Sequence, residues 1–260
     1  MQLIAVDIGN SSTKIALVNR ENHEQWCVRT EFQPDNSIEL ANFLDQLKGP
    51  AFWSASSVSL SRQKSLQQWI AENRPSDRFH EICESDVPLK SNVESRTQLG
   101  RDRLVSAWIA VQLNFQSGPI IVVDAGTAVT IDLIDENLVF QGGHIFPGAE
   151  SNFRQLAQNT DALPDLSSEK REGRFSELKS GAIGKSTSTA ILQGVYQAQI
   201  GAIRGTVEAI SSKQIAPPAV FATGGGIKDI AEFLPADWNY VPDLVLLGAK
   251  DIGRILMANV

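Results

Sequence analysis

The chain has 260 residues, of which 42% are hydrophobic and 20% are charged, and its formal net charge is −7. This is the composition of a folded globular protein, and a chain of this length buries roughly 70–75% of the surface that it exposes when unfolded. Nucleic-acid binding normally requires a basic surface because phosphate neutralisation dominates affinity, and the sequence holds no long cluster of Lys and Arg. We therefore expect no nucleic-acid partner.

The cysteines and the first residues indicate the cellular compartment. Cys27 and Cys83 are the only cysteines and lie far apart, which favours free thiols in a reducing compartment. The first apolar run has no cationic segment before it, Asp7 interrupts it, and no apolar stretch of the sequence is long enough to span a bilayer. We expect a cytoplasmic protein without a membrane partner.

The first half of the chain predicts strands followed by helices. Short runs rich in Val, Ile and Ala predict strands over 3–10, 13–20 and 51–58, and a short turn joins the first two. Apolar residues at helical spacing predict helices over 61–73 and 100–115.

The second half of the chain opens in a similar way. Residues 120–134 predict a strand, a turn and another strand, and 142–148 are expected to form a Gly/Pro-rich turn. Helices are predicted over 149–160 and 187–211, and a polar loop over 165–180.

The longest predicted helix is expected to bury one face, which carries Ile191, Val195, Ala198 and Ala202. The chain closes with a predicted strand over 219–226, which ends in glycines, and a helix over 244–259.

Two stretches share one order of residue types: a buried strand, an Asp, a Gly, a hydroxyl residue and another strand. They are Asp7–Lys14 and Asp124–Thr130, more than a hundred residues apart. A repeat at this distance indicates two similar halves, with a boundary near Ser117 that gives lobes 1–116 and 117–260. One such stretch is usually only a turn, but two copies after buried strands favour a two-lobed cleft in which equivalent hairpins clamp phosphates.

The first stretch combines the groups that a nucleoside triphosphate needs. Gly lets backbone N–H groups approach a ligand, hydroxyl residues add donors, and Lys14 supplies a point charge for a terminal phosphate. Asp7 would repel a phosphate directly, so its expected role is to hold the Mg²⁺ that bridges the phosphates. The ATP-binding residues predicted here are Asp7, Ile8, Gly9, Asn10, Ser11, Ser12, Thr13 and Lys14.

Two other nucleotide motifs are rejected. Gly184-Lys185-Ser186 imitates the end of a Walker A loop, but Lys179 stands where that motif needs its earlier Gly. No G-x-G-x-x-G follows a predicted strand, which argues against a dinucleotide site.

An ordered set of motifs along nearly the whole chain resembles one family, type III pantothenate kinase, within the acetate and sugar kinase/Hsp70/actin superfamily. The two Asp-Gly stretches resemble the phosphate motifs of that superfamily. The further matching stretches are Gly100–Arg103, Gly142–Gly148, Gly184–Thr187, Ala222–Gly225 and 243–249.

The resemblance implies an α/β fold, a duplicated ribonuclease-H-like (actin-like ATPase) fold whose two lobes have a nucleotide cleft between them. It implies ATP-dependent phosphorylation of pantothenate to 4′-phosphopantothenate, the first step of coenzyme A biosynthesis. It further implies a homodimer, with its interface expected in lobe 117–260, and a need for Mg²⁺ and for a monovalent cation, K⁺ or NH₄⁺.

The resemblance also assigns roles within the motif Gly100–Arg103. Asp102 is the expected general base, and the alternative role of capping the following helix is compatible with it. Arg103 is expected to bind the substrate carboxylate or the charge on the transferred phosphoryl group; the alternative is a surface Arg on a helix. Gly100 lines the helix N-terminus where an anionic substrate would dock. Arg101 stands at a variable position, where it either narrows the pocket or adds an anion contact.

In the second lobe the resemblance makes Asp124 the ligand of the monovalent cation and Thr127 an ATP contact, and turn chemistry is the alternative for both. Thr187 is expected to reach the substrate in the neighbouring subunit, or else to cap the helix that follows it. Gly224–Gly226 are expected to pass near the adenosine or to form only a strand-to-helix turn.

The stretch before Gly100 departs from the family pattern. Val93 falls about where the family has an aromatic residue over pantothenate, and Ser95-Arg96 replaces an Asn-Pro pair. Closure over the substrate is therefore expected to differ. Two other functions stay open as alternatives: a different enzyme of the superfamily, which would generally be longer, and a catalytically weak, nucleotide-binding regulatory relative.

Overall fold

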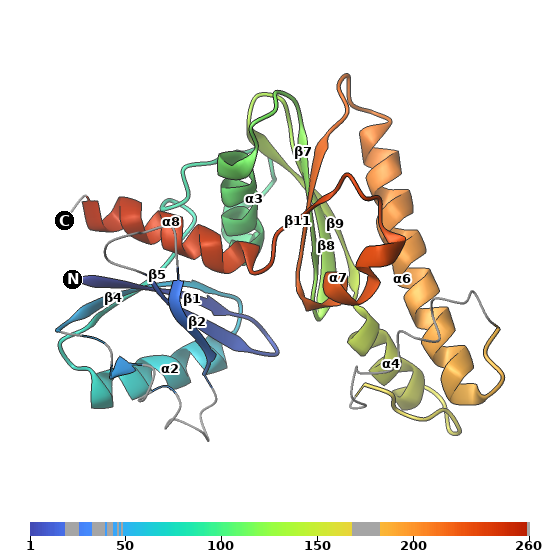
Figure 1. Cartoon of the computed structure of the whole chain (residues 1–260), viewed down its shortest axis with the longest axis horizontal. Helices are drawn as coiled ribbons and strands as arrows, with labels where there is room; N and C mark the ends of the chain where they lie inside the picture. The colour runs from blue at the N-terminus through green and yellow to red at the C-terminus, as the bar shows by residue number, and fades with distance from the viewer. Residues whose placement is uncertain are drawn as a thin grey trace. The chain divides into compact units, whose positions relative to one another are not determined.

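The computed structural model describes residues 1–18, 26–32, 40, 44–45, 47, 49–167 and 183–258, with the backbone alone at 26–31. The chain divides into two compact units (Figure 1). The first comprises Met1–Phe115, Leu138–Phe140 and Asp243–Val260, and the second comprises Gln116–Asn137 and Gln141–Pro242.

The first unit is built on a five-stranded sheet in the order β3-β2-β1-β4-β5. β2 is antiparallel to both β1 and β3, whereas β4 is parallel to both β1 and β5. The strands predicted around the first Asp-Gly stretch and over 51–58 are confirmed. The five strands are β1 (Gln2–Ile8), β2 (Thr13–Val18), β3 (Trp26–Glu31), β4 (Ala51–Ser57) and β5 (Arg78–Glu81).

The second unit repeats this topology in the strand order β9-β8-β7-β10-β11. β7 is antiparallel to β8 and parallel to β10, and β10 is parallel to β11. A short strand, β6, pairs with the first residues of β9, which belong to the first unit. The same strand order in both units confirms the duplicated ribonuclease-H-like fold. These strands are β6 (Lys90–Ser91), β7 (Ile120–Ala125), β8 (Ala128–Ile134), β9 (Val139–Pro147), β10 (Ala219–Thr223) and β11 (Asn239–Tyr240).

The alternation of side chains along β1 explains how the first sheet is buried on both faces. Ile4, Val6 and Ile8 point to one face, where they share a core with Leu66 of α2 (Leu60–Asn73). The intervening residues point to the opposite face because the side-chain period of a strand is two. That second face carries the candidate active site described below.

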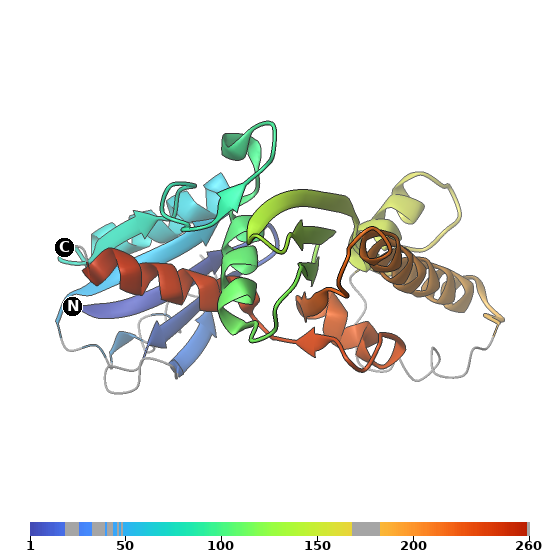
Figure 2. The same ribbon diagram turned by 90° about the horizontal axis from the view of Figure 1, so that it is seen from above.

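Two helices cover this opposite face. α8 (Leu244–Ala258) packs on β1 and β4, and α3 (Arg101–Leu113) packs on α8 (Figures 1 and 2). Glycines make the contacts close: a Cβ at Gly253 would lie 2.7 Å from Leu3 Cδ1, and one at Gly248 would lie 2.6 Å from a carbonyl oxygen of α3. This packing places the C-terminal helix in the first unit, whereas the division drawn from the sequence had assigned it to the second lobe.

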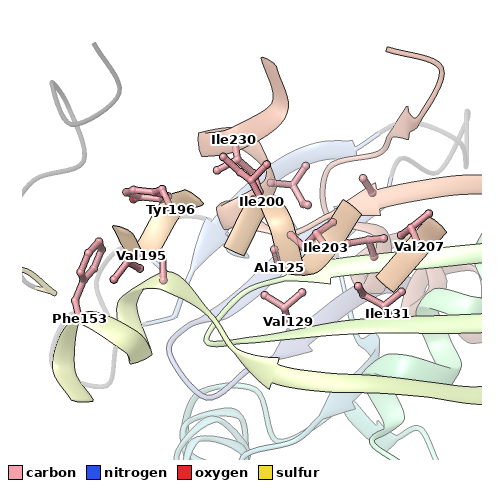
Figure 3. Close-up of a cluster of buried hydrophobic side chains, with 14 of the residues drawn as sticks. Ala125, Val129, Ile131, Phe153, Val195, Tyr196, Ile200, Ile203, Val207 and Ile230 are labelled. Atoms are coloured by element: carbon pink, nitrogen blue, oxygen red, sulfur yellow. The ribbon is translucent and has the colours of Figure 1, made fainter. Parts of the chain in front are cut away.

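The described residues of the second unit include the helices α4 (Ala149–Gln158), α6 (Thr187–Ser211) and α7 (Gly225–Ile230). The helices predicted over 149–160 and 187–211 are confirmed. Figure 3 shows their apolar side chains against the strands β7 and β8. Members of this core include Ala125, Val129, Ile131, Phe153, Val195, Tyr196, Ile200, Ile203, Val207 and Ile230.

The buried face of α6 differs from the predicted one. Ala198 and Ala202 are exposed, although Ile191 and Val195 are buried as expected. The predicted residues form one stripe along the helix. In the structure, the helix is turned so that the neighbouring stripe, which carries larger side chains, packs into the core. The buried residues of α6 are Ile191, Leu192, Val195, Tyr196, Gln199, Ile200, Ile203 and Val207.

The Gly/Pro-rich turn predicted over 142–148 is wrong, because most of that stretch continues β9. Gly142 has φ 90°, and a Cβ at Gly143 would collide with the carbonyl oxygen of Ile131 on β8. These glycines therefore serve close packing within a sheet and not chain reversal.

The predicted loop over 165–180 lies largely outside the described residues. Short 3₁₀ turns span Arg96–Gln98 and Ala231–Phe233. Within the described part of the chain, none of the helices combines the length and apolarity that crossing a membrane requires.

Candidate active site

The first predicted phosphate stretch forms the β1–β2 hairpin of the first unit. Gly9 N donates to Ser12 O at 2.9 Å, which closes the turn. The antiparallel register places Asp7 directly opposite Lys14. Paired residues of a hairpin project to the same face, so this carboxylate and this ammonium are neighbours.

The tip of the hairpin is held by a residue that the sequence did not single out. Arg62 of α2 donates from Nε to Asn10 O at 3.1 Å and from Nη2 to Ser11 O at 2.8 Å. Ile8 and Thr13, predicted with the ATP-binding residues, are fully buried. Their side chains are therefore part of the core, and only their backbone groups could take part in binding.

Asp7 lies on the sheet face that α3 and α8 cover. Burial raises the pKa of Asp7 from 3.8 to about 6, the charge of Lys14 opposes this shift, and the charges of Asp102 and Asp243 add to it. Charges act on a pKa in this way only from nearby. Three carboxylates and one ammonium, from four separate segments of the first unit, therefore gather at the end of β1.

Lys14 forms an ion pair within this cluster. Its Nζ lies 2.9 Å from Oδ1 of Asp243, and the two side chains are 33% and 18% exposed. Asp243 directly precedes α8 and has a left-handed backbone, with φ 57°. No sequence spacing could have linked the two residues, because 229 positions separate them.

Asp102 lies in the first turn of α3, after Gly100 as the N-cap. Its Oδ1 accepts a hydrogen bond from Arg103 N at 2.9 Å. Burial raises the pKa of Asp102, although the Arg103 amide and guanidinium oppose the shift. A Cβ at Gly100 would lie 2.6 Å from this Oδ1, so the glycine leaves room for the carboxylate. The capping role considered as the alternative for Asp102 is not found, because the N-cap is Gly100 and Asp102 lies within the first turn of the helix. Its raised pKa suits a general base.

The two arginines of the motif point to different partners. The guanidinium carbon of Arg103 lies 5.7 Å from the ring centroid of Phe140, within the range of a cation–π contact. Nη1 of Arg101 lies 3.4 Å from Oε1 of Glu81 on β5. Of the two possibilities for Arg101, an added anion contact is the less favoured, because a carboxylate of the protein already faces its charge.

The second predicted phosphate stretch forms the β7–β8 hairpin of the second unit. Gly126 N donates to Ala128 O at 2.9 Å, and the register places Asp124 opposite Thr130. Asp124 is half-buried and Thr127 is exposed. The turn chemistry that was the alternative at these positions is therefore present.

Glycines and hydroxyls surround this second turn. The carbonyl oxygen of Thr127 accepts hydrogen bonds from Gly148 N at 3.0 Å and from Ser151 Oγ at 2.7 Å. Gly224, with φ 91°, passes so close to the hairpin that a Cβ there would collide with the Asp124 carboxylate. The predicted strand-to-helix turn over the glycines is confirmed, and it lies against Asp124.

Thr187 is the first residue of α6 and is exposed. The cap of that helix is the preceding residue, Ser186, whose Oγ accepts from Thr189 N at 3.2 Å while Ser186 N donates to Thr189 Oγ1 at 3.0 Å. The capping role considered for Thr187 is therefore wrong by one position. Its side chain is left at the surface of the second unit.

The stretch that departs from the family pattern, residues 90–100, and the residues just before it line an open pocket of about 540 Å³ in the first unit. Arg96 organises it: the guanidinium donates to Glu84 O at 2.8 Å, to Val87 O at 3.1 Å and to Ser91 Oγ at 3.3 Å. Arg96 thus joins the stretch to the residues that precede it in the chain. The lining residues are Glu84, Ser85, Val87, Pro88, Leu89, Lys90, Arg96 and Thr97.

Among the described residues, no group of three or more His, Cys, Asp and Glu side chains is arranged to hold a metal ion by itself. A metal that arrives with nucleotide phosphates needs only one or two carboxylates from the protein. Asp7 fits such a role, because the carboxylates of Asp102 and Asp243 make its surroundings favourable for a cation.

Comparison with known proteins identifies relatives over the whole chain. The model of the family described as type III pantothenate kinase matches residues 3–209. A type III pantothenate kinase from Synechococcus elongatus is 31% identical, over 100% of this chain and 99% of that protein. One from Persephonella marina is 32% identical, over 96% of this chain and 97% of that protein.

Solved structures at lower identity share the fold. A Campylobacter jejuni protein described as a Baf family transcriptional activator is similar with a TM-score of 0.58 at 20% identity, over the full length of both chains. The activator of the 2-hydroxyisocaproyl-CoA dehydratase from Clostridium difficile, with bound ADPNP, has a TM-score of 0.51 at 12% identity, over 100% of this chain and 98% of that one. An archaeal actin homolog has a TM-score of 0.51 at 12% identity, over 98% of this chain and 100% of that one.

Proposed function

We propose roles for the residues of this site from the premise that the chain belongs to the type III pantothenate kinase family. The protein phosphorylates pantothenate to 4′-phosphopantothenate with ATP, the first step of coenzyme A biosynthesis. The likeness to the transcriptional activator and to the dehydratase activator concerns the fold alone, so no second function is favoured.

One observation carries the assignment of roles. The charge of Asp102 raises the pKa of Asp7, although the two residues belong to different elements, α3 and β1. The expected base and the first phosphate hairpin therefore converge within the first unit.

Asp102 is the proposed general base. The primary hydroxyl oxygen of pantothenate attacks the γ-phosphorus of ATP, the hydroxyl proton passes to the Asp102 carboxylate, and the bond from the γ-phosphorus to the bridging oxygen breaks to release ADP. A raised pKa makes the ionised carboxylate a better proton acceptor. Its Oδ1 already accepts the Arg103 amide, so we assign the incoming proton to Oδ2.

The first hairpin is proposed to bind the phosphates of ATP. Backbone N–H groups at Gly9–Ser12 and the Lys14 ammonium supply donors and positive charge. Asp7 would hold the metal that accompanies the nucleotide, which we propose is Mg²⁺. When bound, that ion neutralises charge on the phosphates.

Gly100 and Arg103 are proposed to bind pantothenate. The N-terminus of α3 offers backbone donors to an anion, and Gly100 lets the substrate approach them. Arg103 is held over the Phe140 ring, which orients its guanidinium for the substrate carboxylate or for charge on the phosphoryl group. Arg101 is proposed to narrow the pocket, since its charge faces Glu81.

Thr127 is proposed as an ATP contact and Asp124 as the ligand of a monovalent cation, K⁺ or NH₄⁺. The exposure of Thr127 and the half-buried carboxylate of Asp124 support these roles. The close approach of Gly224 adds backbone groups near that carboxylate, and oxygen ligands suit such a cation.

A homodimer is proposed, with Thr187 reaching the substrate of the neighbouring subunit. The exposed face of α6 supports this, because it carries Gly194, Gly201 and Gly205, and a Cβ at each would meet nothing within 4 Å. Each Gly in a helix interior costs roughly 0.5–1 kcal/mol relative to Ala, without any benefit within the described part of this chain. Close approach of a second copy of the chain to this face of α6 would explain why these positions are Gly.

The test is an assay of ADP release with and without pantothenate, and with and without K⁺. Turnover should depend on both, and Asp102→Asn should lower kcat by roughly 10²- to 10⁴-fold while ATP binding stays near wild type. A near-normal kcat in this variant would eliminate Asp102 as the base. Nucleotide binding without pantothenate-dependent turnover in the wild type would instead favour the regulatory alternative.

A further inference from the structure

We propose that Asp243 is a positioning residue for phosphoryl transfer, because its ion pair holds the Lys14 ammonium where a nucleotide phosphate binds. This inference rests on the proposed function, since it takes Lys14 as a phosphate ligand. The resemblance to the family includes Asp243 only as the first residue of the stretch 243–249 and implies no role for it.

The contact itself has the character of a strong interaction. Lys14 Nζ and Asp243 Oδ1 lie 2.9 Å apart, and the Asp243 side chain is only 18% exposed. Charge-assisted hydrogen bonds are stronger than neutral ones, and partly buried pairs are screened less by salt. A lysine has a long flexible stem and a point charge, so its ammonium is poorly oriented unless a partner holds it.

Asp243 can act as such a partner because its own position is rigid. Its carbonyl oxygen accepts the first helical hydrogen bond of α8, from Leu247 N at 3.0 Å. α8 in turn cannot shift easily, because Gly253 lies against Leu3 of β1 without room for a Cβ. The carboxylate is thus anchored to the same sheet that carries the hairpin.

The backbone at Asp243 supports a role for its side chain. A φ of 57° is a left-handed conformation, which a Gly would adopt without steric cost. An Asp at this position bears some strain, although less than most other residues would. The presence of Asp where Gly would be easier is explained if the carboxylate is needed beside Lys14.

The ion pair is compatible with phosphate binding. An ammonium group carries three N–H donors, so a bond to Asp243 leaves Lys14 able to donate to a phosphate oxygen as well. An ammonium that is already oriented loses less entropy when the nucleotide binds, which raises affinity. If Asp243 merely competed with the phosphate for Lys14, its removal would have the opposite effect.

The decisive variant is Asp243→Asn, which keeps the shape and the tolerance for a left-handed backbone but removes the charge. We expect KM for ATP to rise on the order of tenfold, with KM for pantothenate unchanged. Direct titration of the protein with Mg-ATP should show the same loss of affinity. In a Lys14→Met background, Asp243→Asn should change ATP affinity by less than about twofold, because the partner is gone.

A matched control lies on the same helix. Asp251 accepts a hydrogen bond from Trp108 Nε1 at 2.7 Å, so Asp251→Asn removes a carboxylate from α8 without touching Lys14. It should leave ATP affinity unchanged. If Asp243→Asn folds poorly, Asp243→Gly relieves the backbone and serves the same purpose.

The outcomes separate this inference from the proposed function. A loss of ATP affinity in Lys14→Met that Asp243→Asn does not share would overturn the role of Asp243 alone. So would tighter ATP binding in Asp243→Asn, or effects of the two variants that simply add. Unchanged ATP affinity in Lys14→Met would overturn the assignment of Lys14 as well.

Discussion

The β1–β2 and β7–β8 hairpins share two features but differ in the length of the turn and in chemistry. In both, an Asp is the second-last residue of the first strand and a Gly amide closes the turn at 2.9 Å, onto Ser12 O in one and onto Ala128 O in the other. The residue opposite the Asp differs: Lys14 faces Asp7, whereas Thr130 faces Asp124. The positions of the Asp and of the Gly amide are therefore shared, whereas the length of the turn and the cross-strand partner differ.

This difference indicates that the two hairpins suit different ligands. The first hairpin has its own cation and lies among further carboxylates, an arrangement suited to phosphates that carry a metal. The second has a neutral hydroxyl residue, Thr130, opposite its Asp in place of a Lys. That arrangement suits a carboxylate whose partner is a bound cation, as proposed above.

The largest effect is expected when the first hairpin is made like the second. Lys14→Thr removes the ammonium and should lower kcat/KM for ATP by on the order of a hundredfold, since charge-assisted phosphate contacts are lost. Steady-state kinetics with ATP as the varied substrate would measure it. Thr130→Val, the matched change in the second hairpin, should lower kcat/KM for ATP far less. Equal losses of kcat/KM for ATP in the two variants would contradict different roles for the two hairpins.

A second prediction concerns stability and its dependence on pH. The pKa of Asp7 in the folded protein is about 6, above its ordinary 3.8, so the folded state binds more protons than the unfolded state between these values. The ionisation of Asp7 lowers the free energy of unfolding. This destabilisation is absent below pH 3.8, grows between pH 3.8 and 6, and is complete above pH 6. Asp7→Asn should therefore raise the free energy of unfolding near neutral pH by about 1–3 kcal/mol, although it impairs the use of ATP.

Urea unfolding at several pH values would check this. The gain in Asp7→Asn should vanish when the pH falls below the ordinary pKa of Asp. A gain that is the same at every pH would show that the ionisation of Asp7 is not its source.

A smaller effect is expected from the Asp of the second hairpin. Asp124→Asn should lower turnover by about tenfold and remove its response to K⁺ and NH₄⁺, because the charged ligand is lost. Titration of the wild type and the variant with each chloride salt would measure this, with Na⁺ as the control for ionic strength. A variant that still responds to K⁺ in full would contradict the assignment.

The smallest effect is expected outside both hairpins. Arg96→Ala removes the donors to Glu84 O and Val87 O, and should raise KM for pantothenate by about two- to fivefold, with ATP kinetics unchanged. Arg96→Lys is the conservative control and should recover part of the loss. A shift in KM for ATP of the same size would show that this stretch is not specific to pantothenate.

The elements that could be predicted were those with a local signal. β1 and β2 are short apolar runs on either side of a Gly-containing turn, and the paired motif revealed the duplication before any strand order was known. The exposed Ala198 and the strand at Gly142 were missed, because the tertiary core decides which helical row is buried and whether a glycine turns the chain or lets a neighbour approach.

The candidate site also combines features with a local sequence signal and features that depend on the tertiary fold. Its residue types and their order were present in the sequence, because the turn, the Asp near the end of a strand and the Gly-x-Asp-Arg motif are local patterns. That Asp102 and Asp243 would both reach the end of β1 was decided only by the packing of α3 and α8 on the sheet. That Thr13 would be buried follows from the register that pairs it with Ile8, on the sheet face that α2 covers. Local sequence determines which backbone shapes are favourable, whereas burial and charge depend on segments distant in the chain, and these meet only when the tertiary fold forms.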